Sequence, residues 1–198
     1  MYTRSFEKLA HHLKSGHVYR REDLLPYSKA VDRDLMRLAL EDFLEKVAPG
    51  LYYAPKISRF GHLPPNDKAL VKAFLRDDDF LLLSWNDYNS LGIGLTQLYN
   101  RTVVYNYKRH GVFKLGDKAF DFRRPARGFP KKLTPAFLVV DLLNNAKELA
   151  DENAKNLKLK IKNKLPNNLL KQAANCAKKY GKVATKKFFT ELSSASST

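Results

Sequence analysis

Three cations recur at every fourth residue early in the chain: Lys29, Arg33 and Arg37. In an α-helix this spacing places them on one stripe, close to opposite an apolar stripe that includes Leu35 and Leu38. Such a helix can rest on its own domain and present cations to a polyanion, and Arg33 can donate two hydrogen bonds to guanine O6 and N7. An ordinary solvated helix face explains the pattern equally well, because four acidic residues are interspersed: Asp32, Asp34, Glu41 and Asp42.

The aspartate, histidine and cysteine residues of the sequence do not match the spacing of a known catalytic or metal-binding motif. The side chains of the consecutive residues 77–79, all aspartates, point in different directions, and no distant histidine or carboxylate motif completes a ligand set. The adjacent His11 and His12 make a poor metal pair for the same reason. Cys176 lies among small residues, which favours a buried and unreactive thiol. We therefore expect no enzyme activity, no metal site and no cofactor.

Two short helices and a strand are predicted ahead of the helix that bears the cations. An apolar stripe from Phe6 to Leu13 predicts the first helix, which Gly16 ends. Residues 18–19 predict a short strand. A second helix at about residues 21–25 is expected to bury Leu24 and Leu25 and to end at Pro26, since proline disfavours helical geometry in the residue before it.

The third helix is predicted at roughly residues 29–44, with Ser28 as its N-cap. It is followed by a hairpin with strands at residues 44–47 and 51–53 around the turn Ala48-Pro49-Gly50. This order predicts a winged helix-turn-helix over residues 1–57, whose third helix enters the major groove of DNA. In the alternative interpretation the hairpin tyrosines merely cover the core. The predicted DNA contacts in this domain are Arg20, Arg21, Ser28, Lys29, Arg33, Arg37, Lys46, Tyr52 and Lys56.

The rest of the chain predicts an α+β domain over residues 64–192, joined to the first by a linker rich in turn formers. Strand patterns occur at residues 80–84, 102–107, 111–115 and 118–122, and the last three are expected to form an antiparallel β-meander. Helical patterns begin at residues 66, 86 and 134, and C-terminal helices at residues 153–192 are interrupted at Pro166 and Gly181. Residues 193–198 are expected to form a disordered tail. The predicted fold class is therefore α+β throughout.

The positive charge of the chain is concentrated at its C-terminal end. The whole chain has 36 basic and 20 acidic side chains, of which residues 126–198 hold 15 and 5. Clustered cations favour a polyanionic partner, because each neutralised phosphate releases condensed counterions. We expect Lys178 and Lys179 to contribute to DNA binding. The alternative is a lysine-rich surface that only keeps the protein soluble.

The composition also indicates where the protein resides. A single cysteine excludes an intramolecular disulfide, which fits a reducing cytosol. No stretch of eighteen apolar residues is present, and charged residues occupy the N-terminus in place of a signal-peptide core. The expected location is cytoplasmic, without membrane contact.

Several short motifs resemble the AbiEi family of antitoxins from bacterial type IV toxin-antitoxin and abortive infection systems. The matching stretches, in order, are residues 18–19 and 23–25, Gly50-Leu51-Tyr52-Tyr53-Ala54-Pro55, Pro64-Pro65-Asn66 and Leu91-Gly92-Ile93-Gly94-Leu95-Thr96-Gln97. The resemblance covers about residues 5–190, and its specificity lies in the order and spacing of the motifs.

This resemblance implies a two-domain antitoxin. The N-terminal winged helix would bind double-stranded DNA at the operator of its own operon and repress it. The C-terminal domain would counteract a nucleotidyltransferase-like toxin without a tight stoichiometric complex, which leaves direct contact with the toxin open. The chain departs from the family at Glu45-Lys46-Val47-Ala48, where the wing is usually more basic.

Three other functions remain compatible with the sequence. An RNA-binding or ribosome-associated protein would use the lysine-rich end and exposed tyrosines. The second alternative is a winged-helix transcriptional regulator that is not linked to a toxin. In a protein interaction module, the helix-turn-helix would only mediate assembly.

Overall fold

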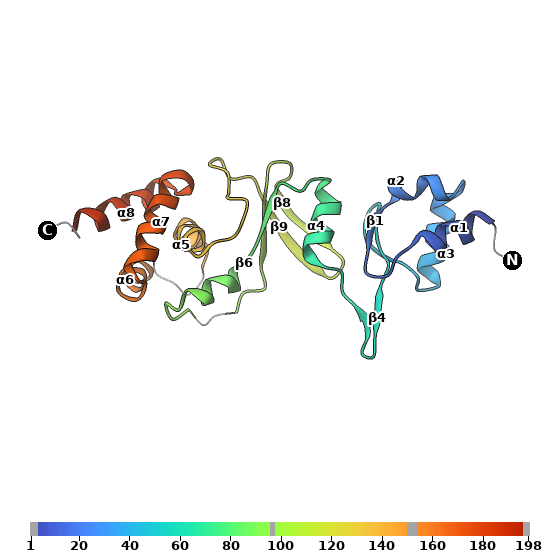
Figure 1. Cartoon of the computed structure of the whole chain (residues 1–198), viewed down its shortest axis with the longest axis horizontal. Helices are drawn as coiled ribbons and strands as arrows, with labels where there is room; N and C mark the ends of the chain where they lie inside the picture. The colour runs from blue at the N-terminus through green and yellow to red at the C-terminus, as the bar shows by residue number, and fades with distance from the viewer. Residues whose placement is uncertain (1–3, 96–97, 150–153, 196–198) are drawn as a thin grey trace. The chain divides into compact units, whose positions relative to one another are not determined.

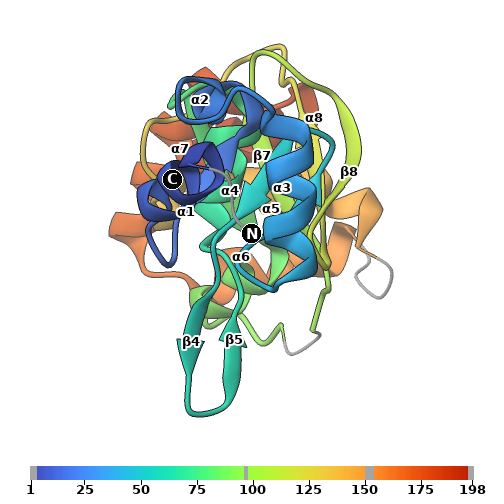
Figure 2. The ribbon, with the colours of Figure 1, turned by 90° about the vertical axis from the view of Figure 1, so that its right-hand side faces the viewer.

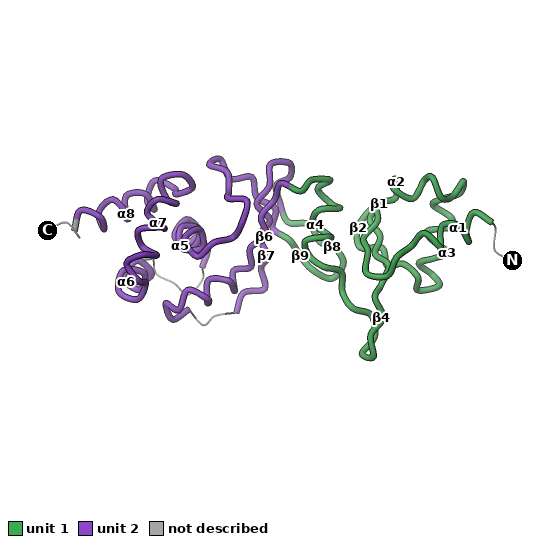
Figure 3. The backbone as a smooth tube through the Cα atoms, in the orientation of Figure 1, with its two compact units in different colours: residues 1–78, 112–120 green, residues 79–111, 121–198 purple. Residues whose placement is uncertain are grey.

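The computed structural model describes residues 4–95, 98–149 and 154–195 as a mixed α+β protein (Figure 1). The chain divides into two compact units (Figure 3). The first unit comprises residues 1–78 and 112–120, and the second comprises residues 79–111 and 121–198. The first unit therefore extends past the predicted boundary at residues 57–64 and takes in a second, distant segment.

The N-terminal part of the first unit alternates helices with strands of one small sheet. Its elements are α1 (Arg4–His12), β1 (Val18–Arg20), α2 (Arg21–Leu24), the 3-10 turn η1 (Leu25–Tyr27), α3 (Val31–Leu40), β2 (Glu45–Ala48) and β3 (Leu51–Tyr53). The sheet has the order β1-β3-β2, and both pairings are antiparallel. Leu9, Leu24, Leu35 and Leu38 are fully buried in the core between the helices and the sheet.

Helix α3 is shorter than predicted at both ends. It starts two residues after Lys29, because the Ser28 hydroxyl accepts a hydrogen bond from the Ala30 amide (2.9 Å) and holds a turn ahead of the helix. It ends at Leu40, since Asp42 adopts a left-handed φ of 60° that stops the helix. The prediction for α2 was wrong in one detail: Leu25 is 46% exposed, because it belongs to the 3-10 turn.

The segment predicted as a linker forms a β-hairpin. Strands β4 (Lys56–Ser58) and β5 (Gly61–Leu63) pair in antiparallel register and project from the first unit (Figure 2). The following helix α4 (Asp67–Leu75) begins as predicted, because the Asn66 side chain accepts a hydrogen bond from the Ala69 amide (3.1 Å).

The four strands β6 (Phe80–Ser84), β7 (Thr102–Asn106), β8 (Gly111–Leu115) and β9 (Lys118–Arg123) form one sheet of order β6-β7-β9-β8. The predicted meander was wrong, because β9 and not β8 lies beside β7. The burial of the two strands gives the reason. In β9 the consecutive residues Phe120, Asp121 and Phe122 are buried, as in a central strand, whereas Val112 and Lys114 of β8 are exposed, as at an edge.

The helices of the second unit pack around α5 (Pro135–Asn145), whose residues 137–142 are all buried. Helices α6 (Ala154–Lys164), α7 (Asn167–Tyr180) and α8 (Val183–Ala195) contact it, as does the 3-10 helix η2 (Trp85–Leu91), and η3 (Ala146–Glu148) continues it. The predicted interruptions at Pro166 and Gly181 are confirmed. The predicted tail was wrong for residues 193–195, which are helical, and residues 196–198 lie outside the described residues, as do Thr96 and Gln97.

Candidate nucleic-acid interface

Helix α3 buries one face and exposes the other. Leu35 and Leu38 are fully buried against α1 and α2, which confirms the predicted core face. On the other side Arg33 is exposed, but so are Met36 (63%) and Leu40 (78%). The exposed face is therefore a mixture of cationic and apolar side chains and not the continuous row of cations that the spacing predicted.

The four predicted arginines are all paired with carboxylates. The Arg21 guanidinium donates two hydrogen bonds to Asp32 (2.6 and 2.5 Å). Arg37 pairs with Glu41 (3.1 Å) and lies over the Phe6 ring at 5.0 Å from its centroid. Pairs so exposed to solvent are weak, so a phosphate can compete for Arg21 or Arg37.

Arg33 and Lys29 are the most accessible of the predicted cations around α3. The Arg33 side chain is 63% exposed, and its Nε lies 3.5 Å from the buried Asp34 carboxylate. Lys29 is exposed in the turn ahead of the helix and not on its stripe. Both lie near the N-terminal end of α3, which is where a recognition helix meets base edges.

Arg20, the last residue of β1, contacts both α2 and α4. Its Nη1 donates to the Ala73 carbonyl (2.6 Å) and to the Phe74 carbonyl (3.4 Å) at the C-terminal end of α4, and its Nε pairs with Glu22 (3.0 Å). These contacts satisfy carbonyls that a helix end leaves without intrahelical partners. The structure thus gives Arg20 a structural role that the prediction of a DNA contact did not anticipate.

Ser28 also has a structural role. It is 7% exposed, and its hydroxyl donates to the Asp34 carboxylate at 2.6 Å. The prediction that Ser28 is the N-cap was wrong, since Ala30 occupies that position. Ser28 and Asp34 instead fix the turn that leads into α3, and in this conformation the Ser28 hydroxyl is not offered to a ligand.

The predicted wing is short and its turn is tied to α2. Lys46 and Tyr52 are paired residues of β2 and β3, and Lys46 is exposed at the sheet edge. Burial raises the pKa of the Tyr52 phenol above its ordinary value. The Arg21 amide donates to the Gly50 carbonyl (2.9 Å), so the turn lies against α2. Lys56 is exposed at the start of β4.

The second unit carries most of the positive charge. Residues 154–195 contain eleven lysines and Glu191 as their one acidic residue. Lys178 and Lys179 are exposed in the last turn of α7, where Lys178 Nζ lies 3.2 Å from Asn175 Oδ1 and Lys179 Nζ lies 5.1 Å from the centre of the Tyr180 ring. Within the part of the chain that the structure describes, neither lysine forms an ion pair with a carboxylate.

A model of the family DUF6088, described as a family of unknown function, matches residues 5–175. The chain belongs to this family. A comparison of this DUF6088 chain with curated proteins finds no match. Among solved structures, the crystal structure of the RV2827C protein from Mycobacterium tuberculosis is similar, at 17% identity and a TM-score of 0.45, over 96% of this chain and 80% of that one. A likeness of this strength says nothing about function.

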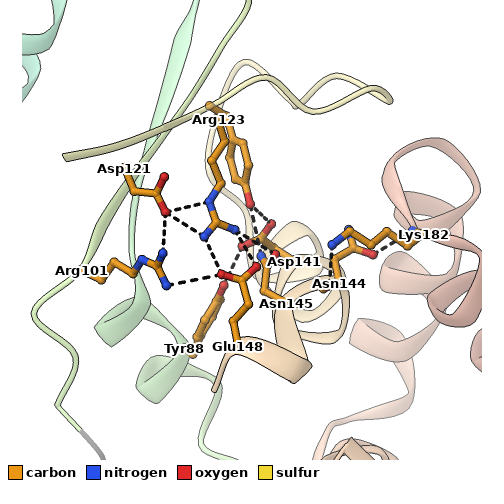
Figure 4. Close-up of polar contacts among 10 residues, drawn as sticks. Tyr88, Arg101, Asp121, Arg123, Asp141, Asn144, Asn145, Glu148 and Lys182 are labelled. Atoms are coloured by element: carbon orange, nitrogen blue, oxygen red, sulfur yellow. Dashed lines mark hydrogen bonds and ion pairs between the residues drawn. The ribbon is translucent and has the colours of Figure 1, made fainter. Parts of the chain in front are cut away.

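The DUF6088 chain buries a carboxylate that the sequence analysis did not single out. Asp141 is 2% exposed on α5, and its two oxygens accept hydrogen bonds from the Tyr88 and Tyr105 hydroxyls, each at 2.6 Å (Figure 4). The Asn145 amide donates to Tyr105 Oη (3.2 Å). Burial raises the pKa of Asp141 above its ordinary value, and burial together with Asp141 raises the pKa of both phenols.

Beside this group lies a network of arginines and carboxylates. Arg123 pairs with Asp121 (2.8 Å) and Glu148 (2.7 Å), and Arg101 contacts the same two carboxylates at 3.0 and 3.4 Å. These residues join β9 to η3 and to the residue before β7. No sequence motif indicated the network, because its members come from three distant parts of the chain, at residue 101, residues 121–123 and residue 148.

Candidates for other chemistry remain weak in the DUF6088 chain. Among the described residues, no group of histidine, cysteine and acidic side chains is arranged to hold a metal ion. Asp78 of the aspartate run pairs with Lys72 (2.8 Å). Burial raises the pKa of the half-buried Cys176 thiol, which lowers its thiolate content. None of the described helices has the length and apolar character needed to cross a membrane.

Proposed function

We propose that the first unit is a winged helix-turn-helix that binds duplex DNA sequence-specifically through the N-terminal half of α3. The observation that carries this proposal is the order of elements: helix, strand, helix, turn, helix and two strands, with the sheet order β1-β3-β2. This arrangement leaves one face of α3 free of the core, as a recognition helix requires.

The side chains on that face suit the major groove. Arg33 supplies a bidentate donor for guanine, and the apolar Met36 suits contact with a thymine methyl group. Lys29, Lys46 and Lys56 are exposed and available for phosphates. The lysines of α6 to α8 add a salt-dependent, sequence-independent attraction.

The test of this function uses the full chain and the duplex that lies upstream of its own reading frame. Affinity measured at two salt concentrations should fall as salt rises and should exceed the affinity for random duplex. Equal affinity for both duplexes, or an affinity that salt does not change, contradicts the proposal. Tighter binding to the corresponding RNA would favour an RNA-binding protein instead.

Replacing Arg33 should relax sequence recognition. For Arg33→Ala we expect a loss of about 1–3 kcal/mol in discrimination at one base pair, with nonspecific binding nearly unchanged. Competition with duplexes mutated at single positions measures this loss. The matched control is Arg127→Ala, which removes an exposed arginine of the second unit. Equal discrimination by wild type and Arg33→Ala would place base recognition elsewhere.

Lysines of α7 should strengthen binding without sequence preference. Changing Lys178 and Lys179 together to glutamine should weaken binding to all duplexes alike and lower the salt slope by up to about 1.8, if each lysine neutralises one phosphate. Affinities over a series of salt concentrations give the slope. A change confined to one sequence, or an unchanged slope, argues against this role.

The biological role we propose is that of an antitoxin that represses its own operon and counteracts a nucleotidyltransferase-like toxin. It is supported by the resemblance of the motifs to the AbiEi family. A co-transcribed neighbouring gene for such an enzyme is the expected observation. Co-expression of this protein should restore growth of cells that express the toxin, and failure to restore growth would leave a winged-helix regulator without a toxin partner.

A further inference from the structure

The β4–β5 hairpin exposes apolar side chains. Ile57 is 74% exposed, Phe60 84% and Leu63 40%. No strand residue of the hairpin is buried, although a two-stranded hairpin gains little stability in water without a covered face. Exposed apolar side chains on a projecting element are typical of a surface that another molecule covers.

The hairpin is nevertheless held in one shape. At its root the buried Tyr53 hydroxyl donates to the Leu63 carbonyl (2.8 Å) and accepts from the Lys56 amide (3.3 Å), so both strands are tied to β3. At its tip the Ser58 hydroxyl accepts from the Phe60 amide (3.1 Å) and donates to the Gly61 carbonyl (3.0 Å). The exposure of Phe60 is therefore imposed by an ordered turn.

The charge around Phe60 points to the kind of partner. Residues 54–66 contain Lys56 and Arg59 and no acidic residue, and His62 contacts the Glu45 carboxylate of β2 at 3.1 Å. The Arg59 guanidinium lies over the Phe60 ring, 4.6 Å from its centroid. An aromatic side chain flanked by cations suits a partner with stacked rings and phosphates. A second copy of this chain is a poor partner, because its net charge of +16 would repel the hairpin.

We propose that the hairpin enters the minor groove of the bound duplex and that Phe60 inserts between base pairs as an apolar wedge. This proposal rests on the proposed duplex binding by the first unit. The hairpin projects from that unit, and three extended residues reach about 10 Å, which exceeds the roughly 7.5 Å depth of the minor groove (Figure 2). Apolar wedges of this kind bend DNA, while Lys56 and Arg59 would contact the phosphates on either side.

The test compares wild type, Phe60→Ala and Phe60→Leu on the duplex upstream of the reading frame. Dyes on the two duplex ends report bending by energy transfer, and anisotropy reports affinity. Wild type should bend the duplex, Phe60→Ala should bind roughly tenfold more weakly and leave it nearly straight, and Phe60→Leu should restore part of the bend. The matched control is Leu98→Ala, since Leu98 is 82% exposed outside the hairpin. It should behave as wild type.

The outcomes separate this inference from the proposed function. Duplex binding with the same bend for wild type and Phe60→Ala overturns the wedge and leaves duplex binding intact. No duplex binding by wild type overturns both. If Phe60→Ala turns a dimer into a monomer in sedimentation, the hairpin joins two copies and the wedge is overturned. The variant Arg59→Gln gives a second measure of contact between the hairpin and DNA. Loss of one phosphate contact should lower the salt slope of binding by about 0.9.

Discussion

Asp141→Ala should lower the free energy of unfolding of the second unit by about 4 kcal/mol. The change removes the acceptor of two tyrosine hydroxyls, each of which lies 2.6 Å from a carboxylate oxygen. Tyr88 is fully buried and Tyr105 is 5% exposed, so water cannot replace the lost acceptor without opening the core. Each unsatisfied buried hydroxyl costs roughly 1–3 kcal/mol.

Urea unfolding followed by the fluorescence of Trp85 measures this loss, because Trp85 is the only tryptophan and is buried in the same core. The control Glu191→Ala removes an exposed carboxylate from α8 of the same unit. A loss below about 1 kcal/mol for Asp141→Ala, within the range of ordinary surface substitutions, would contradict the role assigned to the carboxylate.

Asp141 should also make the stability of the second unit depend on pH. Burial raises the pKa of Asp141 in the folded state above its unfolded value, so the folded state binds the proton more tightly. This contribution to stability is complete below the unfolded pKa of about 4 and is lost as the pH rises through the folded pKa. Wild type should therefore gain stability relative to Asp141→Asn as the pH falls from neutral to about 4. A difference that does not change with pH would contradict the raised pKa.

Leu35→Ala should destabilise the first unit by about 3 kcal/mol. Leu35 is fully buried on α3, between the other helices and the sheet, and its truncation leaves a cavity that the rigid core cannot fill. Because the only tryptophan lies in the second unit, far-UV circular dichroism is the appropriate probe. Duplex binding should weaken at temperatures where the variant is partly unfolded.

Leu40→Ala is the matched control for Leu35→Ala. It makes the same chemical change on the same helix at a residue that is 78% exposed, so the expected effect on stability is within about 0.5 kcal/mol. Equal losses for the two variants would mean that α3 does not bury the face assigned here.

Local signals in the sequence were sufficient for most elements of the first unit. The stripe of Leu35 and Leu38, the helix start at about residue 66 and the turn at Gly50 depend on residues near one another in the chain, and each is confirmed. Helix ends were less accurate, because the start of α3 depends on a hydrogen bond from Ser28 to Asp34 that competes with capping.

Features that depend on distant residues were missed. The order β7-β9-β8 follows from which strand is buried on both faces, and the run Phe120-Asp121-Phe122 was the signal that could have revealed it. The partners of Asp141 come from η2 and β7, so no spacing rule could bring them together. The arginines around α3 were predicted as free cations, because pairing such as that of Arg21 with Asp32 requires the fold.

The segment 112–120 affects how the chain folds during synthesis and how it responds to proteolysis. It belongs to the first unit, where the Gly116 amide donates to the Val47 carbonyl (2.7 Å) and Phe113 packs on Phe74 at 5.2 Å between ring centroids. On the ribosome, the N-terminal unit therefore cannot complete its packing until residue 120 has emerged. A protease that cuts once between residues 79 and 111 would leave the first unit assembled from two fragments. A fragment that ends at residue 78 would lack part of its own core.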